Sequence, residues 1–113
     1  MPTKLYRLRR RTDFVRVSTK GTKCAVLGLV LLVMKRGDGA AARLGFTVTR
    51  KIGNAVARNR TRRRLKEAAR ALLRERRVSG ADLVLVGRAG TGERDFTALC
   101  EDLRRALIRT GVL

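Results

Sequence analysis

The sequence predicts a single α+β domain in which helices pack against a small β-sheet. The chain has 113 residues, which gives room for one modest hydrophobic core. Hydrophobic residues make up 44% of it, which is enough for a folded domain. Helix-like and strand-like segments follow in the order helix, two strands, helix, strand, helix. We therefore expect residues 1–113 to form one α-β sandwich.

The first half of the chain is expected to supply a helix and a β-hairpin. In "RTDFVRVSTKG", Thr12 can cap a helix and Gly21 can end it. Residues 24–35 are rich in Val and Leu and interrupted by glycine, which favours a strand. "RGDGAA" is typical of a turn into a second strand over residues 43–49, so the two strands are expected to pair.

A long helix is expected after the turn at Gly53 and Asn54. Its apolar residues recur at the spacing of a helix packed on a sheet. They are Leu65, Ala68, Ala69, Leu72 and Leu73. Together with the strands before and after it, this helix would form a βαβ unit if those strands are parallel, and such units are nearly always right-handed.

The last two elements are a third strand and a C-terminal helix. "SGADLVLVGR" combines a turn with an apolar run, which predicts the strand. The glycines at positions 87, 90 and 92 are interpreted as a strand-to-helix turn, because Glu93 follows where a phosphate-binding loop needs Lys. The apolar side of the final helix consists of Phe96, Leu99, Cys100, Leu103 and Leu107.

The charge balance indicates a partner that is a polyanion. Lys and Arg number 28 against 9 Asp and Glu, which gives a net charge of +19. The window from Arg50 to Lys66 contains no carboxylate, and its cations are mostly arginine, whose planar fork suits phosphate. A solvated helix face is the alternative interpretation. Binding of a polyanion is favoured, because the preceding turn also offers backbone amides at a helix N-terminus.

The remaining composition argues for a cytoplasmic protein without membrane association. The longest apolar run, "CAVLGLVLLVM", is about half the length of a membrane-spanning helix. The start, "MPTKLYRLRRRTDF", has no apolar stretch long enough for a signal peptide. Cys24 and Cys100 are far apart and lie among apolar residues, as expected for reduced, buried thiols.

The sequence lacks the residues for protein-based nuclease chemistry. It contains no histidine, so the commonest general acid and base is missing, and no Ser-His or Cys-His pair can form. Glu101 and Asp102 are adjacent and would point in different directions on a helix, which disfavours a two-metal site. We expect no catalytic residue and no metal ligand on this protein.

The segment "LGFTVTRKIGNAVARNRTRRRLKEAAR" resembles the signature of the bacterial ribonuclease P protein subunit, with its Arg-Asn-Arg motif at residues 58–60. The resemblance continues through "RLRRRTDF", "KGTK" and "DLVLVGR". It implies an α-β sandwich with an unusual left-handed βαβ crossover. It also implies that the protein assists a catalytic RNA that removes the 5′ leader of precursor tRNA. The RNA and substrate would hold the Mg²⁺ ions, and no other protein would be an obligate partner.

The resemblance also implies two sets of contact residues. One set, near the loop and the start of the long helix, would bind the catalytic RNA: Arg50, Lys51, Asn54, Arg58, Asn59, Arg60, Arg63 and Arg64. The other would bind the leader in a cleft between the first helix, the sheet and the long helix: Phe14, Ser18, Leu32, Arg58, Asn59, Arg62 and Lys66. Ser18 and Leu32 occupy positions where members of the family often have aromatic residues, so leader binding is expected to rely more on charge than on stacking.

Two other classes of protein stay open at this point. A small ribosomal protein would share the size, the charge and a similar strand-helix crossover. A sequence-specific DNA-binding protein would need a recognition helix, and the turn before Arg58 is not that of a helix-turn-helix. In every case the isolated protein is expected to be only marginally stable, because the cations of the long helix repel one another.

Overall fold

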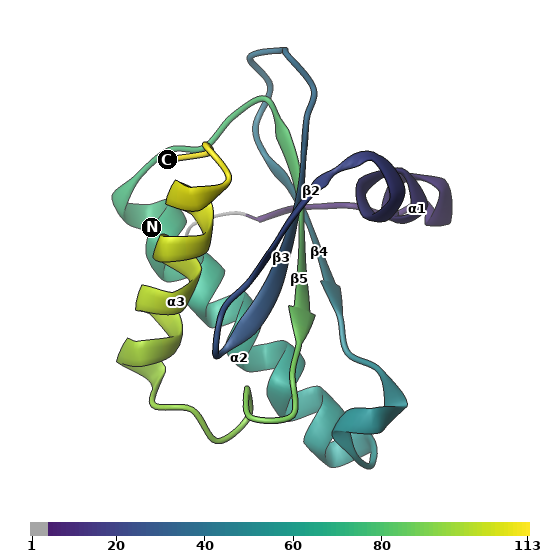
Figure 1. The fold of residues 1–113 in the computed structure, drawn as a ribbon, viewed down its shortest axis with the longest axis vertical. Coiled ribbons are helices and arrows are strands. Elements are labelled where there is room, and N and C mark those ends of the chain that lie inside the picture. Colours follow the sequence, from purple (N-terminus) through teal and green to yellow (C-terminus); the bar gives the residue numbers. More distant parts are fainter. Residues whose placement is uncertain (1–4) are drawn as a thin grey trace.

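The computed structural model describes residues 5–113, which form a five-stranded sheet with three α-helices and one short 3-10 helix (Figure 1). In chain order the elements are β1 (Tyr6–Arg7), α1 (Arg11–Lys20), β2 (Thr22–Ala25), β3 (Leu29–Lys35), β4 (Arg43–Thr47), η1 (Arg50–Ile52), α2 (Ala55–Glu75), β5 (Ala81–Gly87) and α3 (Phe96–Arg109).

The sheet is mixed, with the strand order β1-β4-β5-β3-β2. Its central strand, β5, is antiparallel to β3 and parallel to β4. Six of its seven residues are buried, because helices and neighbouring strands surround it, and this explains why its sequence is apolar apart from Asp82. The expected hairpin between residues 24–35 and 43–49 is therefore wrong, since β5 separates β3 from β4.

The segment from 24 to 35 is also not one strand. β2 and β3 form an antiparallel pair, and the amide of Val26 donates to the carbonyl of Leu29 (3.0 Å) in the turn between them. Gly28 in this turn lies against α3, where an added Cβ would stand 2.8 Å from Leu99 Cδ1. The glycine that interrupts the apolar run thus marks the turn.

β1 was not predicted, because two residues carry no periodic signal. It extends the sheet beyond β4 in parallel, with Tyr6 opposite Arg43 and Arg7 opposite Leu44.

The main core lies between the sheet and the pair of helices α2 and α3, which cover the same face (Figure 1). The predicted stripe of α2 is confirmed: Leu65, Ala68, Ala69 and Leu72 are buried and Leu73 is partly buried. Leu99, Leu103 and Leu107 of α3 are buried as well, whereas Phe96, its first residue, is 40% exposed and is not part of the stripe.

α1 covers the opposite face of the sheet (Figure 1), where Leu8, Val17 and Val84 form a second, smaller core. The helix ends where predicted, since the amide of Gly21 donates to the carbonyl of Val17 (3.0 Å). Thr12 does not cap it, because the helix begins at Arg11 and the cap position is Arg10.

Three further findings bear on the sequence predictions. Among residues 5–113, no helix is long and apolar enough to cross a membrane. Cys24 and Cys100 form no disulfide and are partly buried rather than fully buried. Residues 88–95 form the strand-to-helix turn, in which the hydroxyl of Thr91 accepts from the Arg88 amide (2.8 Å) and donates to the Gly28 carbonyl (2.6 Å).

Candidate nucleic-acid interface

Local hydrogen bonds fix the start of α2. We call residues 50–66, which include η1 and the start of α2, the platform. Gly53 has φ 140°, a conformation that other residues rarely adopt, and it turns the chain from η1 into the helix. The side chain of Asn54 caps the helix by accepting from the Ala57 amide (2.9 Å). Arg58 then donates from Nη1 to the Gly53 carbonyl (2.9 Å), which fastens the helix to the loop. Asn54 and Arg58, both predicted as RNA contacts, thus also hold the local backbone.

The cations on this platform have no carboxylate partners. Within the described part of the chain, no ion pair involves any of Arg50, Lys51, Arg58, Arg60, Arg62, Arg63, Arg64 or Lys66. Some arginines elsewhere are paired, such as Arg94 with Asp102 (2.5 Å) and Arg104 with Glu75 (2.8 Å), whereas others within the described residues, such as Arg9 and Arg77, are not. This segment is distinguished by the concentration of its unpaired cations and by the absence of any carboxylate within it.

The individual side chains differ in accessibility. Asn59, Arg60 and Arg63 are exposed, as predicted for the face opposite the apolar stripe. Arg62 donates from Nη1 to Asn59 Oδ1 (3.1 Å), so these two neighbours present a joint polar surface. Lys51 and Arg50 are exposed in η1 just ahead of the helix.

Arg64 points toward the protein instead. Its Nη2 donates to the carbonyl of Arg94 in the turn before α3, and its Nε is buried without a hydrogen-bond partner among the described residues. Arg64, one of the eight predicted contacts with the catalytic RNA, is thus engaged by the fold in joining α2 to the turn before α3. The sequence does not reveal the difference, because Arg63 and Arg64 are chemically identical.

Lys66 lies at the edge of the sheet beside β1. Its Nζ is 6.0 Å from the centre of the Phe46 ring, and the guanidinium of Arg7 is 5.9 Å from the same ring. Burial lowers the pKa of Lys66, and the nearby charges of Arg7, Arg62 and Arg70 lower it further. The amine thus experiences the positive potential of the surface around it.

The predicted leader surface is divided between two places. Phe14 and Leu32 lie together on the face covered by α1, where they border the small core. Ser18 is exposed on α1, one helical turn after Phe14. Lys66, however, lies over Phe46, whose side chain belongs to the core on the other face of the sheet.

A glycine in β4 leaves room for the ring of Phe14 against the sheet. A Cβ added to Gly45 of β4 would stand 2.3 Å from Phe14 Cε1, so only a glycine allows the ring to lie this close to the sheet. Leu32, Met34 and Val86 are partly buried apolar residues that pack against the same small core as Phe14. This face therefore offers one aromatic ring and an aliphatic surface.

A cluster of ion pairs that was not predicted from the sequence surrounds Asp82 of β5. Asp82 is 1% exposed and accepts from Arg36 Nη1 (2.6 Å) and from Arg43 Nη2 (2.8 Å). Burial would raise the pKa of Asp82, but the hydrogen bonds and charges of Arg43 and Arg36 outweigh it, so the net pKa is lowered. An aspartate inside the apolar run "ADLVLVG" was the available signal for this buried cluster.

The platform should bind small anions. Sulfate would relieve the repulsion among the unpaired cations, so we expect it to stabilise the protein by about 1.4 kcal/mol at ten times its dissociation constant. Thermal unfolding in sodium sulfate, compared with sodium chloride of equal ionic strength, measures this. An unchanged midpoint would contradict the prediction.

Comparison with known proteins decides the family. The family model described as Ribonuclease P matches residues 1–111. The chain belongs to the bacterial ribonuclease P protein family. It is 53% identical over 112 residues to the ribonuclease P protein component of Gluconacetobacter diazotrophicus, and the match covers 99% of this chain and 97% of that one. The ribonuclease P protein component of Paramagnetospirillum magneticum is 41% identical, over 100% of this chain and 88% of that one.

Solved ribonuclease P proteins share the fold. The Staphylococcus aureus protein superimposes with a TM-score of 0.79 at 26% identity, covering 96% of this chain and 98% of that one. The Thermotoga maritima protein gives a TM-score of 0.71 at 33% identity, covering 91% and 96%. The predicted α+β architecture is thereby confirmed.

Membership in this family defines the general role. A ribonuclease P protein is a subunit of an endoribonuclease, takes part in the 5′ processing of tRNA, and associates with the ribonuclease P RNA. The ribosomal and DNA-binding alternatives lose their support, because the match to the ribonuclease P model spans nearly the whole chain.

Proposed function

We propose that this ribonuclease P protein binds the catalytic RNA through the start of α2 and contacts the 5′ leader of precursor tRNA through the surface around α1. The observation that carries the proposal is the segment from residue 50 to 66, whose eight cations have no carboxylate partner in the described structure. Binding of phosphates there would release counterions and remove the self-repulsion.

Within this proposal the RNA carries out the hydrolysis. The chain has no histidine, and no three Asp, Glu or Cys side chains among residues 5–113 lie close enough to hold a metal ion. We therefore assign the Mg²⁺ ions to the RNA and its substrate. The protein would act in the cytoplasm, without a membrane or an obligate protein partner, by screening the repulsion between the two RNAs.

The crossover from β4 through α2 to β5 is proposed to be left-handed, as the family resemblance implies. The parallel pairing of β4 with β5 supports a βαβ unit with α2 as its connecting helix, and the left hand of the crossover rests on the resemblance alone. Asn59 and Arg60 of the Arg-Asn-Arg motif are exposed near the start of α2, which makes them available to RNA.

Reconstitution tests the proposed function. The protein alone should leave precursor tRNA intact, whereas protein added to its cognate ribonuclease P RNA should increase cleavage at low Mg²⁺ concentration. Gel analysis of the 5′ leader and the mature tRNA measures both. Cleavage by nuclease-free protein in the absence of the RNA, or no gain over the RNA alone, would contradict the proposal.

A double variant tests whether the surface around α1 binds the leader. Ser18→Phe combined with Leu32→Tyr should add two stacking platforms near Phe14, each worth about 1 to 3 kcal/mol per base. We expect at least about fivefold tighter holoenzyme binding to precursor tRNA with a long leader, and no change for mature tRNA. An equal change for both RNAs would place the leader elsewhere. Val15→Phe, an exposed change on the same helix, is the matched control.

A further inference from the structure

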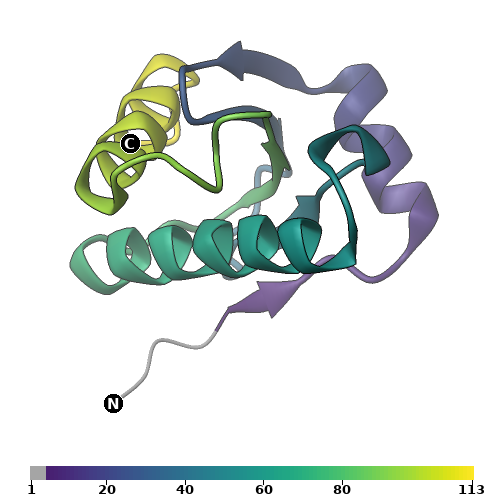
Figure 2. The ribbon, with the colours of Figure 1, turned by 90° about the horizontal axis from the view of Figure 1, so that it is seen from below.

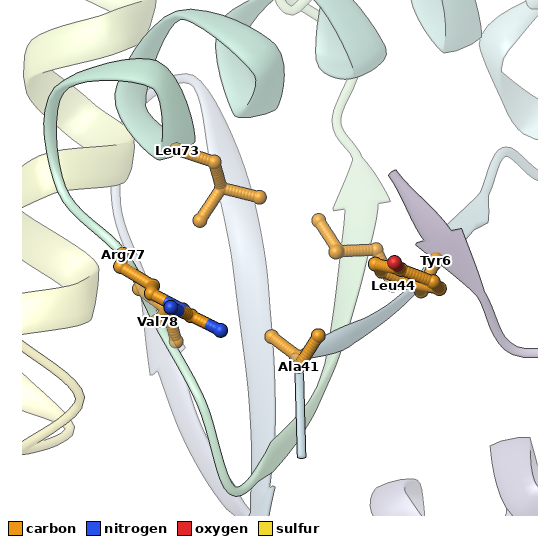
Figure 3. Close-up of a pocket in the computed structure, with 7 residues that line it drawn as sticks. Tyr6, Ala41, Leu44, Leu73, Arg77 and Val78 are labelled. Carbon is orange, nitrogen blue, oxygen red and sulfur yellow. The ribbon is translucent and has the colours of Figure 1, made fainter. Parts of the chain in front are cut away.

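A pocket opens beside the edge strand β1, far along α2 from the Arg-Asn-Arg motif. It has a volume of about 190 Å³ and lies between Tyr6, Leu44, Leu73, Arg77 and Val78. Figure 3 shows the Tyr6 ring next to Leu44, with the guanidinium of Arg77 extending into the space between the end of α2 and β4. A cavity of about 150 Å³ admits a benzene molecule, so this pocket has room for a planar ring.

A larger basic groove adjoins the pocket. It measures about 940 Å³ and shares Tyr6 and Arg77 with the pocket, while Arg7 and Arg9 also line it. Arg36 and Arg43 line it too but are engaged with Asp82, and the one carboxylate of the lining, Asp38, is paired with Arg36. Arg7, Arg9 and Arg77 form no ion pair with any residue in the described range 5–113, so their charge is available to a ligand.

This combination fits an unpaired nucleotide. Single-stranded nucleic acid is bound by aromatic rings on which bases stack, next to cations that hold the phosphates. Tyr6, which is 49% exposed, supplies the ring, and the side chains of Leu44 and Leu73 supply an apolar lining. Arg77 lines both the pocket and the groove and Arg9 lines the groove, so the two offer planar forks to a phosphate attached to such a nucleotide.

The surface between the pocket and the α2 start points to the RNA subunit as the source of the nucleotide. Arg7 of β1 and Lys66 of α2 share the Phe46 ring, and Figure 2 shows β1 running beside α2. Arg62 lies one turn before Lys66, so cations continue from the Arg-Asn-Arg motif toward the pocket. α2 from residue 58 to residue 75 spans about 26 Å at 1.5 Å per residue. Phe14 and Leu32, by contrast, lie on the opposite face of the sheet.

We propose that the pocket between Tyr6 and Arg77 holds an unpaired nucleotide of the ribonuclease P RNA, with its phosphate in the adjoining arginine groove. The inference rests on the proposed function and adds a second RNA contact to the one at the α2 start. The leader of the substrate is the alternative source, and the experiment separates the two.

The test measures binding of the protein to its cognate ribonuclease P RNA without substrate, across a range of salt concentrations. Tyr6→Leu should weaken binding about fivefold or more through lost stacking, with an unchanged salt slope, whereas Tyr6→Phe should bind like wild type. Arg77→Gln should lower the log-log salt slope by about 0.7 and weaken binding about fivefold at 0.1 M salt. Arg76→Gln, an exposed neighbour outside the pocket, is the control and should leave the slope unchanged.

Three results would overturn the inference. The first is unchanged affinity in both Tyr6→Leu and Arg77→Gln while wild type binds the RNA, which would leave the proposed function standing. The second is a loss that appears only in holoenzyme with long-leader substrates, which would assign the pocket to the leader. The third is an equal effect of Arg76→Gln. If circular dichroism shows that Tyr6→Leu is unfolded, the exposed Arg77→Gln and its control decide. Wild-type protein that fails to bind the RNA would instead refute the proposed function.

Discussion

Replacing Asp82 with asparagine is expected to lower the free energy of unfolding by about 3 kcal/mol. Breaking a buried ion pair costs about 3–5 kcal/mol, because a charge is left without its partner. We expect a loss at the lower end of this range, because the Arg43 side chain is 38% exposed and can turn toward water. Arg36, whose side chain is only 14% exposed, would keep Asp38 but would lose the negative charge of its buried partner at position 82. Urea-induced unfolding measures the difference.

A control variant and the pH dependence of stability both test the role of Asp82. Asp38→Asn removes the same charge from a carboxylate that also pairs with Arg36, but Asp38 is half-exposed and its ion pair is screened by water, so a much smaller loss of stability is expected. The pKa of Asp82 is lowered in the folded state, so its stabilisation is present above the unfolded value of about 3.9 and is lost as pH falls through the folded value. The difference in the free energy of unfolding between wild type and Asp82→Asn should therefore become smaller below about pH 4. Equal losses for both variants would contradict the buried role of Asp82.

The double variant Arg60→Gln and Arg63→Gln is expected to weaken binding to the ribonuclease P RNA by about 60-fold at 0.1 M salt. Both side chains are exposed on α2 and have no ion-pair partner within the described chain, so they are available to phosphates. Each lost phosphate contact lowers the log-log salt slope by about 0.7 to 0.9, and 0.9 per contact corresponds to roughly eightfold at this salt concentration. Filter binding at several salt concentrations gives the affinity and the slope together.

A matched pair of arginines controls for net charge. Arg74→Gln with Arg109→Gln also removes two exposed charges, from the ends of α2 and α3 that lie away from the motif. This variant should keep nearly the wild-type slope. If both double variants lose the same affinity, the binding depends on overall charge and not on the start of α2.

The long helix was predictable because several local signals agree. The Gly53 turn, the Asn54 cap and the apolar spacing that includes Leu65 all indicate the same element, and the structure contains it from Ala55 to Glu75. The sheet order was not predictable in the same way. Strands that neighbour each other in sequence usually pair, and here β5 inserts between β3 and β4.

The site was predictable as a region but not residue by residue. Charge without carboxylates locates the segment from 50 to 66, whereas the inward turn of Arg64 depends on the Arg94 carbonyl 30 residues later. The same holds for Asp82, whose partners Arg36 and Arg43 come from other parts of the chain. Long-range partners of single side chains leave no mark on local sequence patterns.

The place of β5 at the centre of the sheet also sets the order in which the protein can fold during synthesis. β5 is the strand to which both β3 and β4 pair, yet it follows every other strand and the whole of α2 in the chain. A nascent chain that ends before residue 81 therefore has the β2–β3 pair but no continuous sheet on which α2 can pack. Since domains fold as units once their parts have emerged from the ribosome, the basic helix leaves the exit tunnel before its support exists. The RNA-binding surface is thus completed only after residue 87 has emerged, when the last strand joins the two halves of the sheet.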